Sequence, residues 1–325
     1  MEEQLFAQRT DLTALNEAVM AIRGEIKKVI VGQDNMVKLI IAALLADGHV
    51  LIEGVPGVAK TLTAKLVARS INIGFSRVQF TPDLMPSDVL GTPVFNPQQG
   101  TFEFKRGPVF SNVILIDEIN RAPAKTQSAL FELMEERQVT VDGRTYLMPM
   151  PFMVLATQNP IEHEGTYRLP EAQLDRFLFK ILVPYPTETE EVEILSQFHQ
   201  MGNAQVVDMI QPVLSGEQVT RLRQQIKTLI IEEKLLQFIA KFIQQTRKHK
   251  SIYLGASPRA SLAVMNASKA IAAISGRDFV TPEDIIEVMG PVLRHRIILA
   301  PDKEMEGVTE DDVIKQILQM MDIPR

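Results

Sequence analysis

The stretch "HVLIEGVPGVAKT", residues 49–61, contains a strand pattern, a glycine-containing loop and the start of a helix. "HVLIE" (49–53) is a short apolar run of the kind that forms a buried strand, and the apolar residues after Lys60 return to helical spacing. The loop between them nearly matches the phosphate-binding pattern, in which backbone N–H groups and a helix N-terminus face an anion. Lys60 adds a positive charge, and Thr61 adds a hydroxyl for Mg²⁺. The stretch therefore predicts a site for the phosphates of a nucleotide.

One position departs from this pattern, because Ala59 stands where the pattern has glycine directly before the lysine. Glycine is needed there only if the backbone is left-handed or if a ligand crowds the Cβ atom. Alanine is the smallest departure from glycine, and it favours the helix that starts at this point. We therefore expect Ala59 to have a negative φ.

A second motif, "VILIDEIN" (113–120), places two carboxylates directly after four apolar residues. The apolar residues predict a buried strand, and α/β sheets bind ligands at the ends of such strands. Asp117 suits the coordination shell of Mg²⁺, and Glu118 suits a base that polarises an attacking water. A third strand pattern ends at Asn159, whose amide is suited to orienting that water, although asparagine before proline is also ordinary turn chemistry.

Strand and helix patterns alternate along the first half of the chain, which predicts parallel strands in an α/β sheet. Four strand candidates follow the first one, at 77–80, 112–116, 152–157 and 177–183. Two segments with alternating apolar residues around turns, 91–107 and 138–148, are predicted to be hairpins added to this core. Beyond them the patterns become helical, without a convincing strand. The sequence therefore predicts an α/β domain over 1–187, which begins with helices, and an all-helical domain over 188–325.

The composition restricts the class of protein. Hydrophobic residues make up 46% of the 325 residues and charged residues 23%, as in soluble globular proteins. There is no cysteine, which excludes disulfides and thiolate metal sites, and the five histidines are too scattered for a local metal cluster. The longest apolar run, 39–46, is far shorter than the roughly 20 residues of a membrane span. The acidic, polar start is not a secretory signal, so we expect a cytoplasmic protein.

The longer motifs resemble those of the MoxR family of AAA+ ATPases, in the clade that carries a helix-2 insertion and a presensor hairpin. The resemblance covers almost the whole chain and is carried by "GVPGVAKT", "LIDEINRAPAKTQSALFELMEERQVTVDG", "ATQNPIEHEGTYRLPEAQLDRF" and "GASPRA". The family also has alanine before the lysine, so Ala59 departs from the general loop but not from this family. The resemblance implies a P-loop AAA+ parallel sheet with strand order 5-1-4-3-2 and a C-terminal helical lid domain.

The resemblance also implies ATP and Mg²⁺ as cofactors. Gly32 and Gln33, in "VGQ" at 31–33, match the segment that lies near the adenine. Thr61 and Asp117 match the residues that hold Mg²⁺. The Walker A loop that binds the nucleotide is matched by Gly54, Val55, Pro56, Gly57, Val58, Ala59, Lys60, Thr61 and Leu62.

Four positions match catalytic residues of the family. Glu118 matches the Walker B glutamate, and Asn159 matches sensor 1. Arg176, in "LDRF", matches the arginine finger that one subunit supplies to the γ-phosphate of its neighbour. Arg259, in "SPRA", matches sensor 2, and the resemblance leaves open which subunit's nucleotide it contacts.

The residues themselves are less decisive about the two arginines. Arg176 stands beside Asp175, and a local ion pair between them is the simpler interpretation of that pair. Arg259 follows Ser257 and Pro258, which together favour a helix start. A cation at a helix N-terminus is electrostatically unfavourable unless an anion also lies there, so this position mildly favours a functional role.

The resemblance implies an ATPase that forms a ring, a hexamer in our prediction, and acts as a chaperone-like remodeller of a client protein. Similar proteins often work with partners that carry von Willebrand factor A domains. A nucleic-acid translocase shares the two inserted hairpins but needs basic hairpin tips, whereas "NPQQG" is uncharged and "DG" is acidic. The net charge of −6 also argues against a nucleic-acid partner. A small-molecule kinase would need an acceptor pocket, and a regulatory scaffold with low turnover would not need the Asp117–Glu118 pair.

Overall fold

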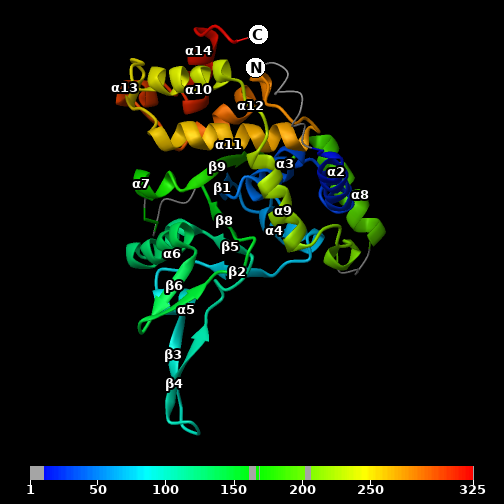
Figure 1. The fold of residues 1–325 in the computed structure, drawn as a ribbon, viewed down its shortest axis with the longest axis vertical. Helices are drawn as coiled ribbons and strands as arrows, with labels where there is room; N and C mark the ends of the chain where they lie inside the picture. Colours follow the sequence, from blue (N-terminus) through cyan, green and yellow to red (C-terminus); the bar gives the residue numbers. More distant parts are fainter. Residues whose placement is uncertain (1–10, 161–165, 168, 202–205, 325) are drawn as a thin grey trace.

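The computed structural model describes residues 11–160, 166–167, 169–201 and 206–324. Part of the long motif that begins at Ala156, including His163, therefore lies outside the described residues, as does the acidic start of the chain. Figure 1 shows three parts: a sheet in the middle, helices stacked at the end that carries the C-terminus, and a thin hairpin that projects from the other end.

The central sheet has five strands in the order β2-β5-β8-β1-β9, and all neighbouring strands are parallel. The strands are β1 (His49–Gly54), β2 (Phe75–Gln79), β5 (Val113–Asp117), β8 (Met153–Gln158) and β9 (Phe177–Val183). Counted along the chain as strands one to five, they have the order 5-1-4-3-2 from the other edge. The predicted α/β sheet and its strand order are thus confirmed.

Alternation along the strands divides the apolar side chains between two cores, as the two-residue period of a strand requires. In β5, for example, Val113 and Leu115 join one cluster, while Ile114 and Ile116 join the other. The second cluster includes buried side chains of α6 (Ala124–Glu136). The first cluster covers the opposite face with α2 (Thr13–Lys27), α3 (Asp34–Leu45) and α4 (Lys60–Ser70).

The first cluster continues from the sheet into the helical end of the molecule, where α11 packs against both α3 and α2. The helices at this end are α10 (Glu233–Thr246), α11 (Pro258–Ile274), α12 (Pro282–Leu293), α13 (Pro301–Met305) and α14 (Glu310–Gln319), while α8 (Glu188–Met201) and α9 (Gly216–Lys227) lie beside the sheet domain (Figure 1). The expectation of no strand in this region was wrong. An antiparallel pair, β10 (Ile252–Leu254) and β11 (Ile298–Leu299), joins the chain before α11 to the chain after α12. These strands are too short to display an alternating pattern in the sequence.

Both predicted hairpins are present. The first pairs β3 (Gly91–Asn96) with β4 (Thr101–Arg106), after the short helix α5 (Pro86–Leu90). The second pairs β6 (Gln138–Val141) with β7 (Arg144–Leu147). In its two-residue loop Asp142 and Gly143 both have positive φ, as the tight turn between twisted strands requires.

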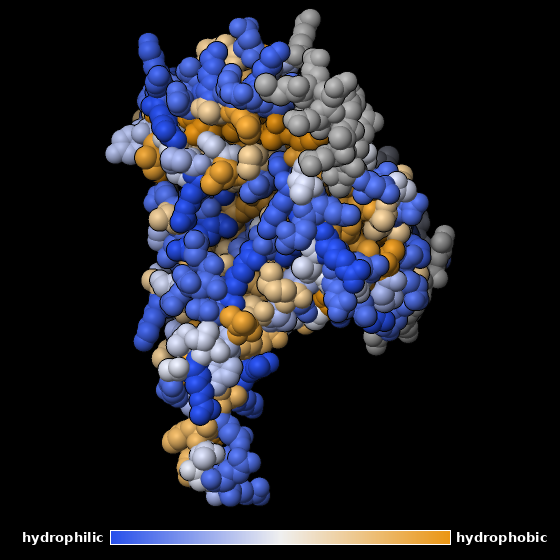
Figure 2. Space-filling view, in the orientation of Figure 1, coloured by the Kyte–Doolittle hydropathy of each residue, from blue (hydrophilic) through white to orange (hydrophobic). Residues whose placement is uncertain are grey.

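The β3–β4 hairpin, hereafter the arm, projects away from the sheet (Figure 1). Its strands contain Phe95, Phe102 and Phe104, and alternate residues of a strand lie on one face. Phe102 and Phe104 share that face, as predicted, but their surroundings differ. Phe102 lies out along the arm with 67% of its surface exposed, and its ring contacts Phe95 at a centroid distance of 5.3 Å. Phe104 lies at the base, with its ring centroid 4.6 Å from that of Tyr146 in the second hairpin. Figure 2 shows hydrophobic surface on the arm, to which the exposed Phe95 and Phe102 contribute.

This difference predicts unequal costs for the same substitution at the two positions. Phe104→Ser should lower the free energy of unfolding by about 1–3 kcal/mol, because it removes a partly buried ring from an aromatic cluster. Phe102→Ser should change it by no more than about 0.5 kcal/mol, because that ring already faces solvent. Urea unfolding of the two variants measures both values, and each variant serves as the control for the other. Equal losses would contradict the division of the arm into a packed base and an exposed outer part.

Candidate active site

The predicted phosphate-binding loop follows β1 directly and ends where α4 begins at Lys60. The Lys60 Nζ donates a hydrogen bond to the Gly54 carbonyl oxygen, 2.5 Å away, so the side chain folds back over the loop. Pro56 and Gly57 are exposed at the tip of the loop, and Gly57 has a φ of 87° that suits glycine. Thr61 is the second residue of α4. The loop and the lysine thus lie between β1 and α4, in the strand-loop-helix order that the sequence predicts.

Ala59 has a φ of 57° and a ψ of 19°, in the left-handed region, so the expectation of a negative φ was wrong. The expectation assumed that the helix already includes this residue. Ala59 instead lies one position before the helix, where its carbonyl oxygen accepts hydrogen bonds from the Thr63 backbone N–H and the Thr63 hydroxyl. The turn itself needs a left-handed residue, which explains the glycine of the general pattern. An L-residue in this conformation costs roughly 1–2 kcal/mol.

The left-handed backbone predicts that Ala59→Gly stabilises the fold. The expected gain in the free energy of unfolding is about 0.5–1 kcal/mol, since the relief of strain exceeds the entropy that glycine adds to the unfolded chain. Urea unfolding provides the measurement. The control is Ala263→Gly inside the right-handed helix α11, which should instead lower stability by about 0.5–1 kcal/mol. A loss of stability in both variants would show that Ala59 is not strained.

The two carboxylates lie at the end of β5, beside the neighbouring strand β8. Asp117 is 7% exposed, and its Oδ1 accepts a hydrogen bond from the Thr157 hydroxyl at 3.1 Å. The Thr157 Oγ1 in turn accepts from the backbone N–H of Glu118 at 3.0 Å. Glu118 has a φ of 56°, a conformation that non-glycine residues rarely adopt and that is frequent at functional sites. Thr157 therefore contacts both the Asp117 carboxylate and the Glu118 backbone.

Strand β2 supplies two further contacts to these acids. The Arg77 Nε donates to Asp117 Oδ2 at 2.6 Å, and the Gln79 Nε2 donates to Glu118 Oε2 at 2.6 Å. Glu118 Oε2 also lies 3.1 Å from the Arg121 Nε. Arg77, Gln79, Arg121 and Thr157 are not among the site residues predicted from the sequence. The i, i+2 spacing of Arg77 and Gln79 is a signal for a shared strand face, but only the register of β2 against β5 shows what that face meets.

The remaining residues predicted to bind or hydrolyse the nucleotide lie directly after β8 and directly before α3. Asn159 follows β8, which runs between β5 and β1, and it is 9% exposed. The structure therefore gathers the loop, the two acids and Asn159 at the carboxyl ends of three adjacent strands. Gln33 precedes α3 and is buried, while Gly32 has a φ of 74° and lies against the Glu190 side chain of α8. Segment 31–33 is thus positioned between α3 and the first turns of α8.

Arg176 lies at the opposite ends of the strands, where β1 and β9 begin. It directly precedes β9, where Phe177 pairs with His49 at the start of β1, whereas the loop follows Gly54, which pairs with Val183. The seven residues of β9 span roughly 20 Å at about 3.3 Å per residue. This distance is greater than an arginine side chain can extend. Arg176 is therefore separated from the phosphate-binding loop of its own chain.

The two arginines meet on a single carboxylate of α6. The Arg176 Nη1 donates to Glu135 Oε2 at 2.6 Å, and the Arg259 Nη2 lies 3.6 Å from Glu135 Oε1. The simpler interpretation of Arg176, an ion pair with Asp175, was wrong, because Asp175 binds the Arg296 Nε at 2.6 Å instead. The structure thus brings together the two predicted arginines and separates them from the other predicted site residues.

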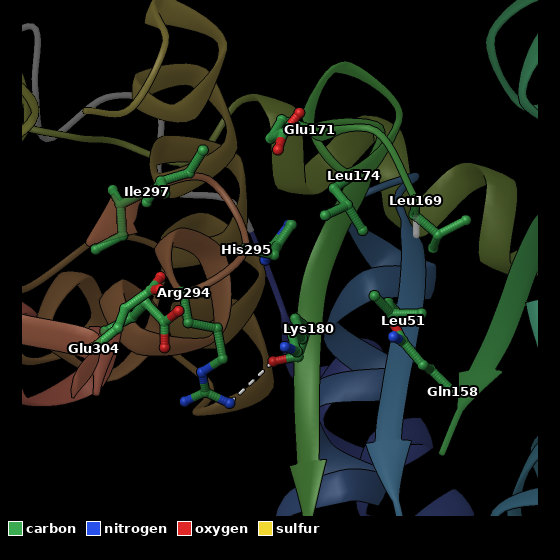
Figure 3. A pocket seen from close by; sticks show the side chains of 12 residues that line it. Leu51, Gln158, Leu169, Glu171, Leu174, Lys180, Arg294, His295, Ile297 and Glu304 are labelled. Carbon is green, nitrogen blue, oxygen red and sulfur yellow. Dashed lines mark hydrogen bonds between the residues drawn. The ribbon is translucent and has the colours of Figure 1, made fainter. Parts of the chain in front are cut away.

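A pocket of about 180 Å³ lies between the sheet and the helical end (Figure 3). It is lined by Gln158, Lys180, Arg294 and His295, among others, and the Arg294 Nη1 donates to the Lys180 carbonyl oxygen at 3.0 Å. None of the predicted site residues lines this pocket. The contacts across it instead tie the loop after α12 to β9.

The loop at 54–62, Asp117, Glu118 and Asn159, hereafter the loop edge, offer a set of donors and acceptors that fits a magnesium-bound nucleotide. Backbone N–H groups and an ammonium suit phosphate oxygens, and the Thr61 hydroxyl and the Asp117 carboxylate are the oxygen ligands that Mg²⁺ prefers. Among the described residues no group of three or more histidine, aspartate or glutamate side chains forms a separate metal site. Within the same residues, no helix has both the length and the apolar character of a membrane span.

Comparison with known proteins agrees with this geometry. Residues 49–179 match the ATPase family associated with various cellular activities (AAA), and residues 244–317 match the AAA lid domain. "Chaperone MoxR1" of Mycobacterium tuberculosis is 46% identical over 93% of this chain and 81% of its own length. "Protein MoxR" of Methylorubrum extorquens is 30% identical over 96% and 97%.

A solved structure from Cytophaga hutchinsonii, named as that of a candidate ATPase, superposes with a TM-score of 0.90 at 41% identity. It covers all of this chain, and this chain covers all of it. The similarity extends along the whole chain. It therefore includes the segments that form the loop, the paired acids, the central sheet and the C-terminal lid. The chain belongs to the MoxR family of AAA+ ATPases.

Proposed function

We propose that this protein hydrolyses ATP at sites shared between neighbouring copies in a ring, and that it uses the hydrolysis to remodel partner proteins. The observation that carries the proposal is the separation of the catalytic groups. The loop and the acids lie at the carboxyl ends of the strands. Arg176, with Arg259 beside it, lies at the other ends, and the length of β9 separates Arg176 from the loop by roughly 20 Å. A single chain therefore holds two half-sites that face different directions.

The loop edge supplies the binding and hydrolytic groups. Lys60 and the backbone N–H groups of the loop at 54–62, where only Pro56 lacks one, hold the phosphates. Thr61 and Asp117 hold Mg²⁺, and segment 31–33 lies near the adenine. Glu118 polarises the attacking water, with Asn159 orienting it. Bound Mg²⁺ would neutralise charge on the phosphates. Glu118 is held by Gln79 and Arg121, which orient the carboxylate that acts on the water.

Arg176 and Arg259, hereafter the arginine edge, supply positive charge to the next copy. Arg176 has the role of an arginine finger, which stabilises charge on the transferred phosphoryl group. Arg259 is proposed to act on the same neighbouring nucleotide, because it shares Glu135 with Arg176. An interface between two different surfaces is heterologous, and repeated copies of it form a ring when the rotation between neighbours closes. We propose a hexamer.

The remodelling role rests on the relatives and on the arm. One relative is named a chaperone, and the arm presents exposed apolar side chains at the end of the molecule away from the lid (Figure 2). We propose that the client is a protein, that a von Willebrand factor A domain partner assists, and that the protein works in the cytoplasm. In this proposal residues 1–187 form the nucleotide-binding domain, and residues 188–325 form the lid that moves with the nucleotide state.

A nucleic-acid substrate is less well supported. The arm turns through an asparagine-stabilised tip, in which Asn96 Oδ1 accepts a hydrogen bond from the Gln98 backbone N–H. The basic residues of the arm lie toward its base, where the Arg106 guanidinium stacks 5.2 Å from the ring centroid of Phe110. The tip therefore has little positive charge for phosphate contacts.

The test is the rate of ATP hydrolysis per chain as a function of chain concentration, measured beside the oligomeric state by analytical ultracentrifugation. Because each site needs two chains, the rate per chain should rise together with the fraction of assembled protein. A rate per chain that stays constant while the protein dissociates would contradict shared sites. No hydrolysis by fully assembled protein would favour a nucleotide-dependent scaffold instead.

A further inference from the structure

We infer that Glu135 is a positioning residue that holds Arg176 and Arg259 as one unit for the neighbouring copy's nucleotide. The inference rests on the proposed function, since it assigns a role at the shared site. Glu135 is absent from the set of residues that the sequence motifs identified. It acts through the arginines and does not itself contact the nucleotide.

The first observation is the geometry of the carboxylate. Its Oε2 takes one hydrogen bond from Arg176 at 2.6 Å, and its Oε1 faces Arg259 at 3.6 Å. A guanidinium has five N–H donors, so one contact to Glu135 leaves further donors of each arginine for a phosphate, although the Arg176 Nε is buried. Glu135 therefore restrains both side chains without consuming their capacity to bind an anion.

The second observation is electrostatic. Two guanidinium groups that converge on one place repel each other, and a carboxylate between them offsets that repulsion. The cluster keeps a net positive charge, because two cations share one anion. The side chains are 27% exposed for Arg176, 63% for Arg259 and 44% for Glu135, so the cluster opens onto the surface where another copy can reach it.

The third observation concerns what fixes the backbone around the arginines. Asp175 accepts a hydrogen bond from the Ser257 hydroxyl at 3.0 Å, which links the residue before Arg176 to the residue two positions before Arg259. The buried Arg296 binds the Asp175 carboxylate and also donates to the Phe177 carbonyl oxygen at 2.6 Å. Burial lowers the pKa of Arg296, while its hydrogen bond to Asp175 opposes that shift. The chain is thus held on both sides of Arg176.

The position of Glu135 is fixed in the same way. Phe131, one turn earlier on α6, packs edge-on against Phe177 with ring centroids 6.0 Å apart. Phe177 directly follows Arg176, so this contact sets the distance between α6 and the start of β9. Residues i and i+4 lie on the same helix face, which directs Glu135 toward Arg176. Packing and charge therefore agree on one arrangement of the three side chains.

The test is Glu135→Ala, with Glu136→Ala as the matched control. Glu136 is the next residue of α6 and lines a separate hollow with Leu90 and Val139. Because misplaced groups affect the transition state more than ATP binding, kcat of Glu135→Ala should fall about 10- to 100-fold, while KM for ATP stays within about twofold. The control should keep wild-type kinetics. Both variants should keep their melting temperature, since exposed ion pairs contribute little to stability.

The decisive measurement mixes Glu135→Ala with Lys60→Ala chains. The Lys60→Ala chains carry an intact Glu135, so their arginine edge should restore the sites of the Glu135→Ala chains. Normal kcat in Glu135→Ala, or a loss that the mixture does not restore, would overturn the inference. A parallel mixture of Arg176→Ala and Lys60→Ala separates the two levels. Recovery there without a Glu135 effect refutes only the role of Glu135, whereas no recovery there refutes the shared site and this inference with it.

Discussion

A mixture of Lys60→Ala and Arg176→Ala chains is expected to hydrolyse ATP although each variant alone is nearly inactive. Lys60→Ala removes the phosphate contact of the site that a chain carries but leaves its Arg176 intact. Arg176→Ala does the reverse, and it removes a contribution to the rate of about 10³ or more. In mixed rings some interfaces join an intact Lys60 to an intact Arg176. Steady-state phosphate release, measured over a range of mixing ratios, should therefore pass through a maximum.

The structure provides a matched control for this experiment. Arg259 shares Glu135 with Arg176, so both lie on the same edge of the chain. A mixture of Arg176→Ala and Arg259→Ala joins each loop edge to an arginine edge that lacks one of the two cations. It should show no recovery beyond the more active variant. The recovery in the first mixture should also fade on dilution, because it needs co-assembly. Mixtures that stay inactive despite demonstrated co-assembly would contradict the shared site.

Glu118→Gln is expected to separate ATP binding from hydrolysis. The substitution removes the carboxylate that polarises water, so kcat should fall by about 10² or more. Lys60, Thr61 and Asp117 remain in place to hold Mg-ATP, and ATP affinity should be largely kept. The amide can still accept the hydrogen bond from Gln79, which limits structural change at the site. Single-turnover hydrolysis and equilibrium binding of a fluorescent ATP analogue measure the two effects.

Lys60→Ala is the control for this separation, because it should lose affinity as well as turnover. Near-normal hydrolysis by Glu118→Gln would show that another group serves as the base. A parallel loss of affinity would show that Glu118 is mainly a binding residue. The buried and hydrogen-bonded Asp117 would then become the better candidate for a role in the chemistry.

The loop edge of the site could be predicted from the sequence because each of its parts is local. The loop, the two acids and Asn159 each directly follow an apolar run, and parallel strands bring their carboxyl ends together. The handedness of Ala59 could not be predicted in this way. It depends on how the loop enters α4, and helix propensity describes only the helix itself.

The sequence identified Arg176 and Arg259 as candidate residues, but it did not predict that they meet at Glu135. Arg176 and Arg259 are 83 positions apart, and Glu135 lies on a third segment, a helix within one of the family motifs, where no role was predicted for it. Their meeting depends on how the lid packs against the sheet, which no local pattern describes. The contact between Gln79 and Glu118 was missed for a related reason, because it depends on the register of two strands.

The arm has a mechanical consequence. It continues from α5, which follows the strand whose Arg77 and Gln79 contact the two acids. Its six-residue strands are roughly 20 Å long at about 3.3 Å per residue. An antiparallel hairpin of that length acts as a lever arm when it moves as one unit. If its base rotates by about 10°, its tip moves by about 3–4 Å, so a small rotation of the base becomes a displacement the size of one residue at the tip.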